Sequence, residues 1–247
     1  MSSLALAIRY LTILPLPGSG HHPPDGLGRA SAWFPVVGAG LGGLLVLTDH
    51  LTARVFPPWV SAALTVVVWK VLSGGVHLDG LADCLDGLAG RDREHRLAIM
   101  RDSRIGTFGA AGLALFLVLE VVALAEVPPP VRWRVLLAAA PIARAMPPLL
   151  ARLFRPARSE GHGAAFAAGV SGGGAGLAVT AALLIAFAAL GAAGIVAMLL
   201  AGLVAVAGAA LLAHRLGGFT GDVLGGALEV AELVVVLTVL AWLGAQA

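Results

Sequence analysis

Three aspartates in the segment 74–90, GGVHLDGLADCLDGLAG, have the types and spacing of a metal-binding site. Asp79, Asp83 and Asp86 follow one another at intervals of four and three residues. On a helix, which turns by about 100° per residue, the three carboxylates fall within roughly a 60° arc. Oxygen ligands with room for water suit Mg²⁺ or Mn²⁺ and a phosphate-bearing substrate. The alternative is a solvated helix end whose acids balance nearby arginines.

A second polar motif, MRDSRIGTFG, occupies residues 100–109. Arg101 and Arg104 could hold phosphate oxygens, because each guanidinium offers a fork of hydrogen-bond donors that matches them. Ser103 is a candidate for a further substrate contact, and Asp102 could join a metal or orient a hydroxyl group. The same residues are also typical of a helix start, with Asp102 or Ser103 as the capping side chain. The two interpretations are compatible.

A third motif, RLGGFTGDVLGGALEVAE at residues 215–232, surrounds Asp222 with five glycines. Glycine-rich backbone beside a carboxylate allows a phosphate or nucleotide to approach closely. Close helix packing with a capped helix start explains the same pattern, and the motif taken alone slightly favours packing. Glu229 and Glu232 follow Asp222 by seven and ten residues, near the same helix face.

Two further residues are candidates for substrate contacts. His77 lies two residues before the first aspartate and could orient the loop or contact the substrate. Arg144, in the apolar stretch PIARAM, needs a partner or an aqueous cavity, and phosphate binding from within the helix bundle would satisfy that need. His162, in SEGHGAAF, is a weaker candidate for a general base or a substrate contact, because a lone loop histidine more often has neither role.

The composition indicates that membrane-spanning helices position these residues. Of the 247 residues 59% are hydrophobic and only 12% are charged, with a mean hydropathy of +0.93. A soluble domain carries about 25% charged residues. The alternating pattern of a membrane barrel is absent, as is any nucleic-acid-binding motif. We therefore expect an all-α, polytopic transmembrane bundle that forms one integral-membrane catalytic domain over residues 1–247. Cys84, the sole cysteine, permits no intrachain disulfide.

Seven apolar stretches have lengths that suit a bilayer of about 30 Å, or nearly so. They are residues 32–51, 59–76, 107–126, 133–153, 177–190, 195–214 and 230–243. The fifth is short, and the break at 191–194 could be a tight turn or a kink, so the sequence predicts six or seven spans. The shorter stretch 4–16 is interrupted by Arg9 and ends in a poor cleavage site, which indicates a retained helix that is interfacial or partly inserted.

The charges predict how the chain is oriented. If the acidic motif faces the cytoplasm, seven spans put eleven arginines on that side and three on the other, a clear positive-inside bias. The first set is Arg9, Arg29, Arg91, Arg93, Arg96, Arg101, Arg104, Arg152, Arg155, Arg158 and Arg215, and the second is Arg54, Arg132 and Arg134. Four polar segments, 1–29, 76–106, 152–176 and 214–229, then share the cytoplasmic face. We therefore expect the active site at the cytoplasmic ends of the helices.

The motifs HLDGLADCLDGL, IMRDSRIGTFG and GGFTGDVLGGALEVAE, in this order, resemble the adenosylcobinamide-GDP ribazoletransferases, also called cobalamin (5'-phosphate) synthases. The N-terminal LTILPLP and the central PIAR…GHGAAF are weaker matches, so the resemblance runs nearly end to end. One departure is Cys84-Leu85, where the family has a small or hydroxyl pair. Another is His162, in a stretch where the family usually reads glycine-leucine-glycine, which weakens a catalytic role for this histidine.

The resemblance implies an inner-membrane enzyme of the last steps of vitamin B12 assembly, with its active site facing the cytoplasm. Such an enzyme joins adenosylcobinamide-GDP to α-ribazole, or to α-ribazole 5'-phosphate, and releases GMP. The expected cofactor is Mg²⁺. The expected partners are these substrates and membrane lipid, and a homo-oligomer or an association with other cobalamin-assembly enzymes is compatible with the sequence.

The motifs suit this reaction, in which the ribose hydroxyl attacks the phosphorus bound to cobinamide and GMP leaves. Asp79, Asp83 and Asp86 would hold one or two Mg²⁺ ions. Arg101 and Arg104 would add positive charge. A carboxylate must take the proton of the attacking hydroxyl. The candidates are Asp102 and Asp222, or a member of the cluster such as Asp86, and the sequence does not choose among them.

Two other functions are alternatives. A CDP-alcohol phosphatidyltransferase also uses an Asp-Gly start and spaced acids, but its usual arginine after the alanine is Asp83 here, and the later acids are spaced differently. An ion-coupled transporter would place acids near the middle of the bilayer in broken helices and would show pseudo-symmetric halves. The sequence shows no such repeat.

Overall fold

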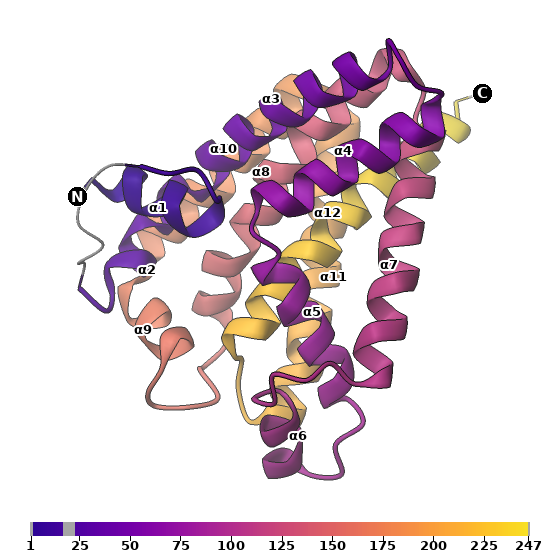
Figure 1. Ribbon diagram of the computed structural model, residues 1–247. Helices are drawn as coiled ribbons and strands as arrows, with labels where there is room; N and C mark the ends of the chain where they lie inside the picture. The colour runs from indigo at the N-terminus through magenta and orange to yellow at the C-terminus, as the bar shows by residue number, and fades with distance from the viewer. Residues whose placement is uncertain (1, 17–22, 247) are drawn as a thin grey trace.

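The computed structural model describes residues 2–16 and 23–246, which fold into helices (Figure 1). These residues form no strand, and one isolated bridge pairs Pro156 with Phe219. The all-α prediction is confirmed. The helices are α1 Ser3–Leu11, α2 Gly26–Ala30, η1 Ser31–Trp33, α3 Phe34–Thr52, α4 Pro58–Leu72, α5 Val76–Gly87, α6 Arg93–Ile99, α7 Thr107–Glu126, α8 Pro129–Leu153, α9 His162–Gly169, α10 Gly172–Leu190, α11 Ala192–Leu216 and α12 Gly221–Gly244.

Six of these helical segments are long and apolar enough to cross a membrane: the continuous segment Gly26–Thr52, and α7, α8, α10, α11 and α12. A seventh crossing is the pair α4 and α5, which passes the same test together but bends by 92°. The prediction of six or seven spans is therefore confirmed, and the chain is a multi-pass membrane protein. The predicted span 107–126 coincides with α7.

The bend between α4 and α5 corrects the predicted span 59–76. Helix α4 ends at Leu72, and Gly74 and Gly75 follow with φ angles of +71° and +68°. Glycine adopts this left-handed conformation without steric cost, whereas other residues avoid it. The two glycines therefore end the span early and start α5 in a new direction. The aspartate motif lies wholly on this second helix.

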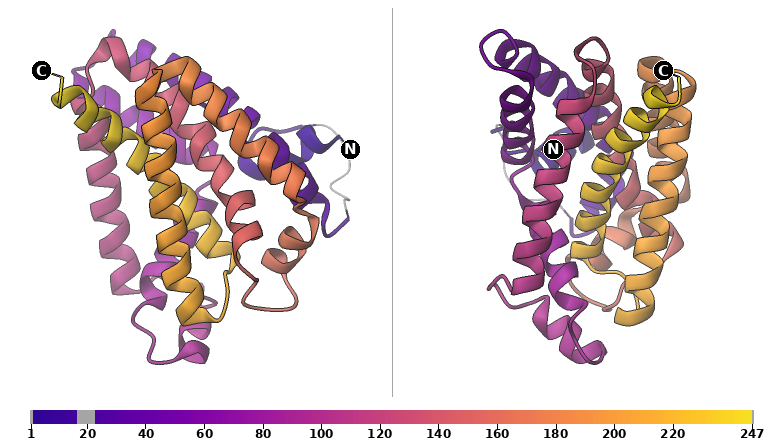
Figure 2. Two further views of the ribbon diagram at one scale, coloured as in Figure 1. Left: turned by 180° about the vertical axis from the view of Figure 1, so that it is seen from behind. Right: turned by 90° about the vertical axis from the view of Figure 1, so that its right-hand side faces the viewer.

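The bundle is built around α8 and α12. The apolar window of α8 is 83% buried and that of α12 is 72% buried, against 28% for α7 and α11 and 22% for α10. Figure 2 shows α11 running alongside α12 at the back of the bundle. The less buried helices expose large apolar side chains, among them Leu115, Leu177 and Leu199, as lipid-facing helices do. Gly191, with φ of +60°, makes the break between α10 and α11 a tight turn.

Five charged side chains pair with one another inside the bundle, and we call them the buried charge cluster. Lys70 Nζ lies 2.9 Å from Glu120, 2.6 Å from Glu229 and 2.9 Å from Glu232. Arg144 Nη1 lies 2.7 Å from the other oxygen of Glu232. The cluster joins α4, α7, α8 and α12. Charges in an apolar interior are tolerated when they are paired in this way.

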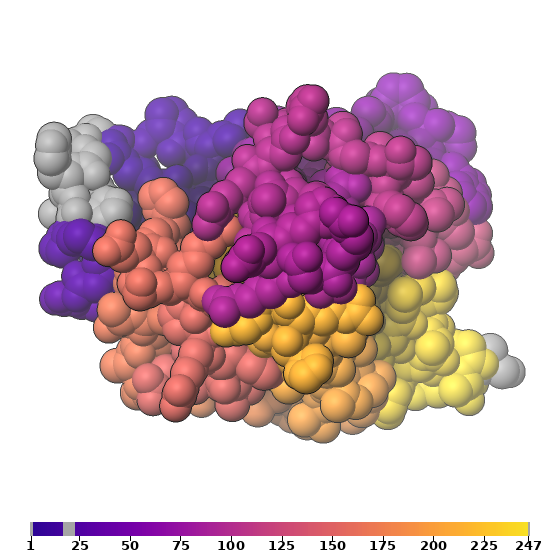
Figure 3. Space-filling model, turned by 90° about the horizontal axis from the view of Figure 1, so that it is seen from below, coloured from indigo at the N-terminus to yellow at the C-terminus, as the bar shows by residue number. Residues whose placement is uncertain are grey.

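The polar segments meet at one end of the bundle, which we call the loop end. Arg93 of α6 donates hydrogen bonds to the carbonyls of Leu216 (2.8 Å) and Ala157 (2.9 Å). Gly28 packs against the backbone around Phe166. Figure 3, seen from this end, shows segments of the middle of the chain beside those near residues 155–170 and 215–225.

The N-terminal stretch forms α1, and the guanidinium of Arg9 on this helix donates a hydrogen bond to the carbonyl of Leu16. This is the helix predicted within residues 4–16. Pro17, the last residue of the LTILPLP match, lies outside the described residues.

Candidate active site

Helix α5 carries all three predicted metal ligands, but they have different surroundings. Asp79 and Asp83 line one cavity of about 440 Å³. Asp86 lies one turn further along and is buried, with 8% of its surface exposed. The carboxylate of Asp83 is close enough to those of Asp79, Asp86 and Asp222 for mutual repulsion. The structure therefore confirms the shared helix and separates Asp86 from the other two acids.

Asp86 caps the start of α7. Its two carboxylate oxygens accept backbone N–H groups from Gly106 and Gly109, each at 2.8 Å. The first N–H groups of a helix lack partners within the helix, and Gly106, the N-cap residue of α7, has no side chain to supply one. The negative charge of Asp86 is also favourable at the positive end of the helix dipole. This aspartate thus fixes the loop 100–106 relative to α5.

The capping contact explains two glycines of the IGTFG sequence. A methyl group on Gly106 or on Gly109 would overlap the carboxylate of Asp86. Neither glycine has a positive φ angle, so close approach rather than backbone conformation requires glycine there. The sequence shows both glycines and the aspartate, but only the fold shows that they touch.

The loop 100–106 closes the cavity over Asp79 and Asp83. Arg101, Asp102, Ser103 and Arg104 all line it, so the structure brings the second motif to the first, as predicted. We call this space the arginine cavity. It has acids on the helix side and two guanidinium groups on the loop side, an arrangement that suits a metal-bound phosphate.

Asp102 forms an ion pair with Arg104. Arg104 donates from Nη2 to Oδ2 at 2.6 Å and from Nε to Oδ1 at 3.0 Å. These hydrogen bonds from a positive guanidinium lower the pKa of Asp102 to about 2. A carboxylate that holds its proton so weakly is a poor general base at neutral pH.

Asp222 reaches the site from the first turn of α12. The hydroxyl of Thr220 donates to Asp222 Oδ2 at 3.0 Å and also caps the helix by accepting from the N–H of Val223. A methyl group on Gly80 would lie 2.8 Å from the carbonyl oxygen of Asp222. Within the motif itself, a methyl group on Gly225 would lie 3.3 Å from the Cα of His77, and one on Gly226 would lie 3.3 Å from the Cα of Leu81. The interpretation of the glycine-rich motif as close helix packing is therefore confirmed, and the packing brings Asp222 against α5.

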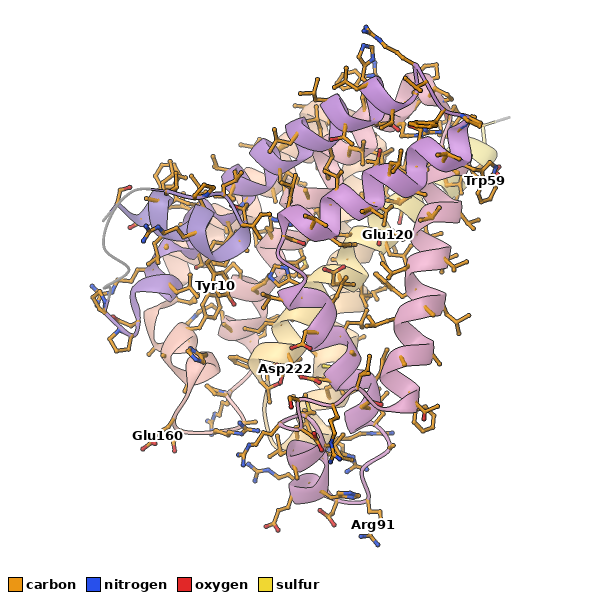
Figure 4. All side chains as sticks on the ribbon, in the orientation of Figure 1. Tyr10, Trp59, Arg91, Glu120, Glu160 and Asp222 are labelled. Atoms are coloured by element: carbon orange, nitrogen blue, oxygen red, sulfur yellow. The ribbon has the colours of Figure 1, made fainter. Side chains whose placement is uncertain are left out.

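A second cavity of about 370 Å³ adjoins the first. Asp79 lines both, and the second is also lined by His77 and Asp222. Its other walls include three aromatic side chains: Tyr10 of α1, Phe34 of α3 and Phe166 of α9. We call it the aromatic cavity. Figure 4 labels two of the residues that line it, Tyr10 of α1 and Asp222 of α12.

The structure separates the two remaining candidates for substrate contacts. His77 is buried but lines the aromatic cavity, and its Nδ1 has no hydrogen-bond partner. Arg144 is fully buried, lines neither cavity, and pairs with Glu232 in the buried charge cluster. His77 is therefore placed to meet a ligand, and Arg144 is placed to stabilise the bundle.

Some features of the site escaped sequence reasoning. The aromatic residues carry no signal in an apolar chain, although Phe34 stacks between Tyr10 and Phe166 with ring centroids 6.0 and 6.1 Å apart. His162, a weak candidate from sequence, lines the aromatic cavity and a further cavity of about 230 Å³ beyond Asp222. Within residues 2–16 and 23–246, no three His, Cys, Asp or Glu side chains converge as a ready metal site.

Comparison with known proteins adds an independent finding. A family model described as cobalamin-5-phosphate synthase matches residues 3–241. Proteins named adenosylcobinamide-GDP ribazoletransferase are similar along their whole length. The one from Geotalea daltonii is 36% identical over 237 residues, covering 96% of both chains. The one from Ralstonia nicotianae is 39% identical over 250 residues, covering 97% of this chain and 95% of its own. No solved structure shows a significant match.

Proposed function

The chain belongs to the cobalamin-5-phosphate synthase family, and on this premise we propose that it transfers adenosylcobinamide phosphate from adenosylcobinamide-GDP to α-ribazole or its 5'-phosphate. The product is adenosylcobalamin or its 5'-phosphate, and GMP is released. The observation that carries the proposal is the arginine cavity. Asp79 and Asp83 line it together with Arg101 and Arg104, a combination of acids and guanidinium groups that suits cleavage of a pyrophosphate.

The reaction exchanges one phosphorus–oxygen bond for another. The acceptor's ribose hydroxyl forms a bond to the phosphorus that carries cobinamide. The bond from that phosphorus to the bridging oxygen breaks, and the bridging oxygen leaves with GMP. Arg101 and Arg104 would hold the phosphate oxygens and offset the charge that develops on the leaving group.

The acids of the arginine cavity fit a magnesium ion. Mg²⁺ is usually bound through one or two carboxylates, and substrate phosphates and water complete its coordination. Asp79 and Asp83 repel each other and face a shared space, which supplies this donor set. When bound, the ion would neutralise pyrophosphate oxygens. Asp86 contributes by positioning, because both its oxygens already accept amides of α7.

Asp222 is the best candidate for the base that takes the hydroxyl proton. Asp102 is held by Arg104 with its pKa lowered to about 2, and Asp86 is occupied at the start of α7. Asp222 instead lines the aromatic cavity, where its carboxylate accepts one hydrogen bond from Thr220 and retains accepting capacity. We infer that Asp222 accepts the proton and that Thr220 orients it.

The location in the cell is part of the proposal. We propose that the chain lies in the inner membrane with the loop end in the cytoplasm, where nucleotide substrates are present. The support is the positive-inside bias, since the segments 88–106 and 154–161 hold seven arginines at this end. Replacing Glu160 by Cys in a Cys84→Ser background tests it. An impermeant maleimide should label the protein in lysed cells and not in intact ones.

The comparisons favour neither alternative function, because the similar proteins are named as ribazoletransferases. The direct test incubates purified protein in detergent with adenosylcobinamide-GDP, Mg²⁺ and either acceptor. We expect GMP and the cobalamin product in equal amounts, measured by chromatography and mass spectrometry. Turnover without a sealed membrane also excludes a transporter as the sole function. Absence of product with both acceptors would overturn the proposal.

A further inference from the structure

We propose that the aromatic cavity is the binding site of the nucleoside acceptor, with its flat heteroaromatic base among Tyr10, Phe34 and Phe166 and its ribose toward Asp222. The arginine cavity then holds the pyrophosphate donor. This inference rests on the proposed function, and it specifies which substrate enters which space.

The first argument is the way the two cavities adjoin. Asp79 lines both. Of these two cavities, Asp83 lines the arginine cavity alone, and Asp222 lines the aromatic cavity alone. Phosphoryl transfer places the attacking and leaving oxygens on opposite sides of the phosphorus. With the pyrophosphate held at the arginines, GMP leaves on that side. The hydroxyl must therefore arrive from the side of the aromatic cavity.

The second argument is the chemistry of the walls. Phe34 is fully buried and stacks between the other two rings, and Leu27, Pro147 and Leu224 add apolar surface. Acidic and imidazole groups also border the space, at Asp79, Asp222 and His77. A ribosylated aromatic base has the same division into a flat apolar part and a polar sugar. Aromatic side chains bind bases by stacking.

The third argument is size. A cavity of about 370 Å³ lies in the range of about 300 to 1,000 Å³ that small ligands occupy. It suits a nucleoside and is too small for a corrin ring with its side chains. The macrocycle of the donor must therefore stay outside the aromatic cavity. Guanosine has the right size, but it belongs to the leaving group and so to the arginine side.

The fourth argument is the proton. The base must lie within hydrogen-bond reach of the attacking hydroxyl. Asp222 borders the aromatic cavity and is held by Thr220. An acceptor bound there brings its ribose to this carboxylate. The hydroxyl proton passes to Asp222 as the oxygen bonds to phosphorus and the bond to GMP breaks, so that atoms and charges balance.

The test compares the Michaelis constants of the two substrates. We expect Phe166→Ala to raise KM for α-ribazole about ten- to a hundredfold, the cost of losing one stacking partner, and to change KM for adenosylcobinamide-GDP by less than about twofold. Ala165→Phe, which fills the cavity without creating a void, should act in the same direction. The matched control is Phe187→Ala, which removes the same side chain from the lipid-facing surface of α10.

Two results would overturn the assignment. A rise in KM for the donor alone would place the guanosine in the aromatic cavity. Unchanged constants in both folded variants would show that the cavity binds neither substrate. Equilibrium dialysis of α-ribazole against wild type and Phe166→Ala, without donor, separates this inference from the proposed function. Weaker binding by the variant supports the acceptor site even where turnover fails, and equal binding contradicts it.

Discussion

Two groups of carboxylates in this bundle have opposite surroundings. In the buried charge cluster, Glu120, Glu229 and Glu232 each lie within 2.9 Å of a nitrogen of Lys70 or Arg144. At the loop end, Asp79, Asp83 and Asp222 line cavities. Within the described part of the chain, no lysine or arginine nitrogen lies within 4.0 Å of these three.

The difference shows how to separate acids that stabilise a membrane bundle from acids that act on a ligand. Both groups lie on helices and both would look costly in an apolar sequence. The first group is compensated inside the protein. The second group has no such ion pair, so the proposed Mg²⁺ would relieve its repulsion, and the space beside it could hold that ion and a phosphate. Substitutions should therefore affect stability in the first group and activity in the second.

The largest effect is expected at Asp83. Asp83→Asn should lower kcat by about a thousandfold or more, because the proposed metal would supply several kcal/mol of charge stabilisation. Its melting temperature should stay the same or rise, since a repulsion is removed. Initial rates over a magnesium titration and thermal unfolding in detergent measure the two effects. Glu94→Gln, an exposed acid of α6, is the control. Near-normal GMP release by Asp83→Asn at low magnesium would contradict the assignment.

The next effect concerns the buried charge cluster. Glu232→Ala should lower the free energy of unfolding by about 3 to 5 kcal/mol, because it leaves Arg144 buried without a carboxylate. Glu120→Gln leaves a carboxylate beside each cation and should cost less. Denaturation in mixed micelles measures both. Equal losses in the free energy of unfolding would show that the number of cations left unpaired does not decide the cost. A Glu232→Ala variant as stable as wild type would contradict a structural role for the cluster.

A smaller effect is expected at Gly109, which tests the role of Asp86 as a cap. Gly109→Ala places a methyl group on the Asp86 carboxylate and should cost about 1 to 3 kcal/mol, as overpacking does. Gly43→Ala in α3 meets no atom within 4 Å and should stabilise the helix by up to about 1 kcal/mol. Thermal unfolding compares them. If both substitutions changed the stability in the same direction, the contact between Gly109 and Asp86 would not be tight.

The sequence predicts those parts of the fold that depend on local pattern. The apolar stretch 107–126 is α7 itself, and the spacing of the three aspartates places them on one helix. It does not predict which aspartate faces the cavity, because that depends on where α7 begins relative to α5. The bend at Gly74 and Gly75 is missed because the apolar run continues across it.

The remaining features depend on contacts between helices, which the sequence does not reveal. Arg144 and Glu232 read as isolated charges in the sequence, and only helix packing makes them partners. The rings of Tyr10, Phe34 and Phe166 come from three separate helices. In a chain with 59% hydrophobic residues, their pattern does not differ from that of ordinary core positions. Residue type thus predicts the chemistry, and packing selects the residues that perform it.

The smallest effect is expected at Asp102, an acid of the loop end that does have a cation beside it. Its pairing with Arg104 lowers its pKa to about 2, so it stays ionised throughout the range in which the enzyme is assayed. Asp102→Asn should lower kcat less than about tenfold, by loosening Arg104, and should leave the acid limb of the pH–rate profile in place. Asp222→Asn should remove that limb. If Asp102→Asn loses the acid limb instead, Asp102 is the base. An ion pair with a neighbouring arginine would then no longer distinguish a structural acid from a catalytic one.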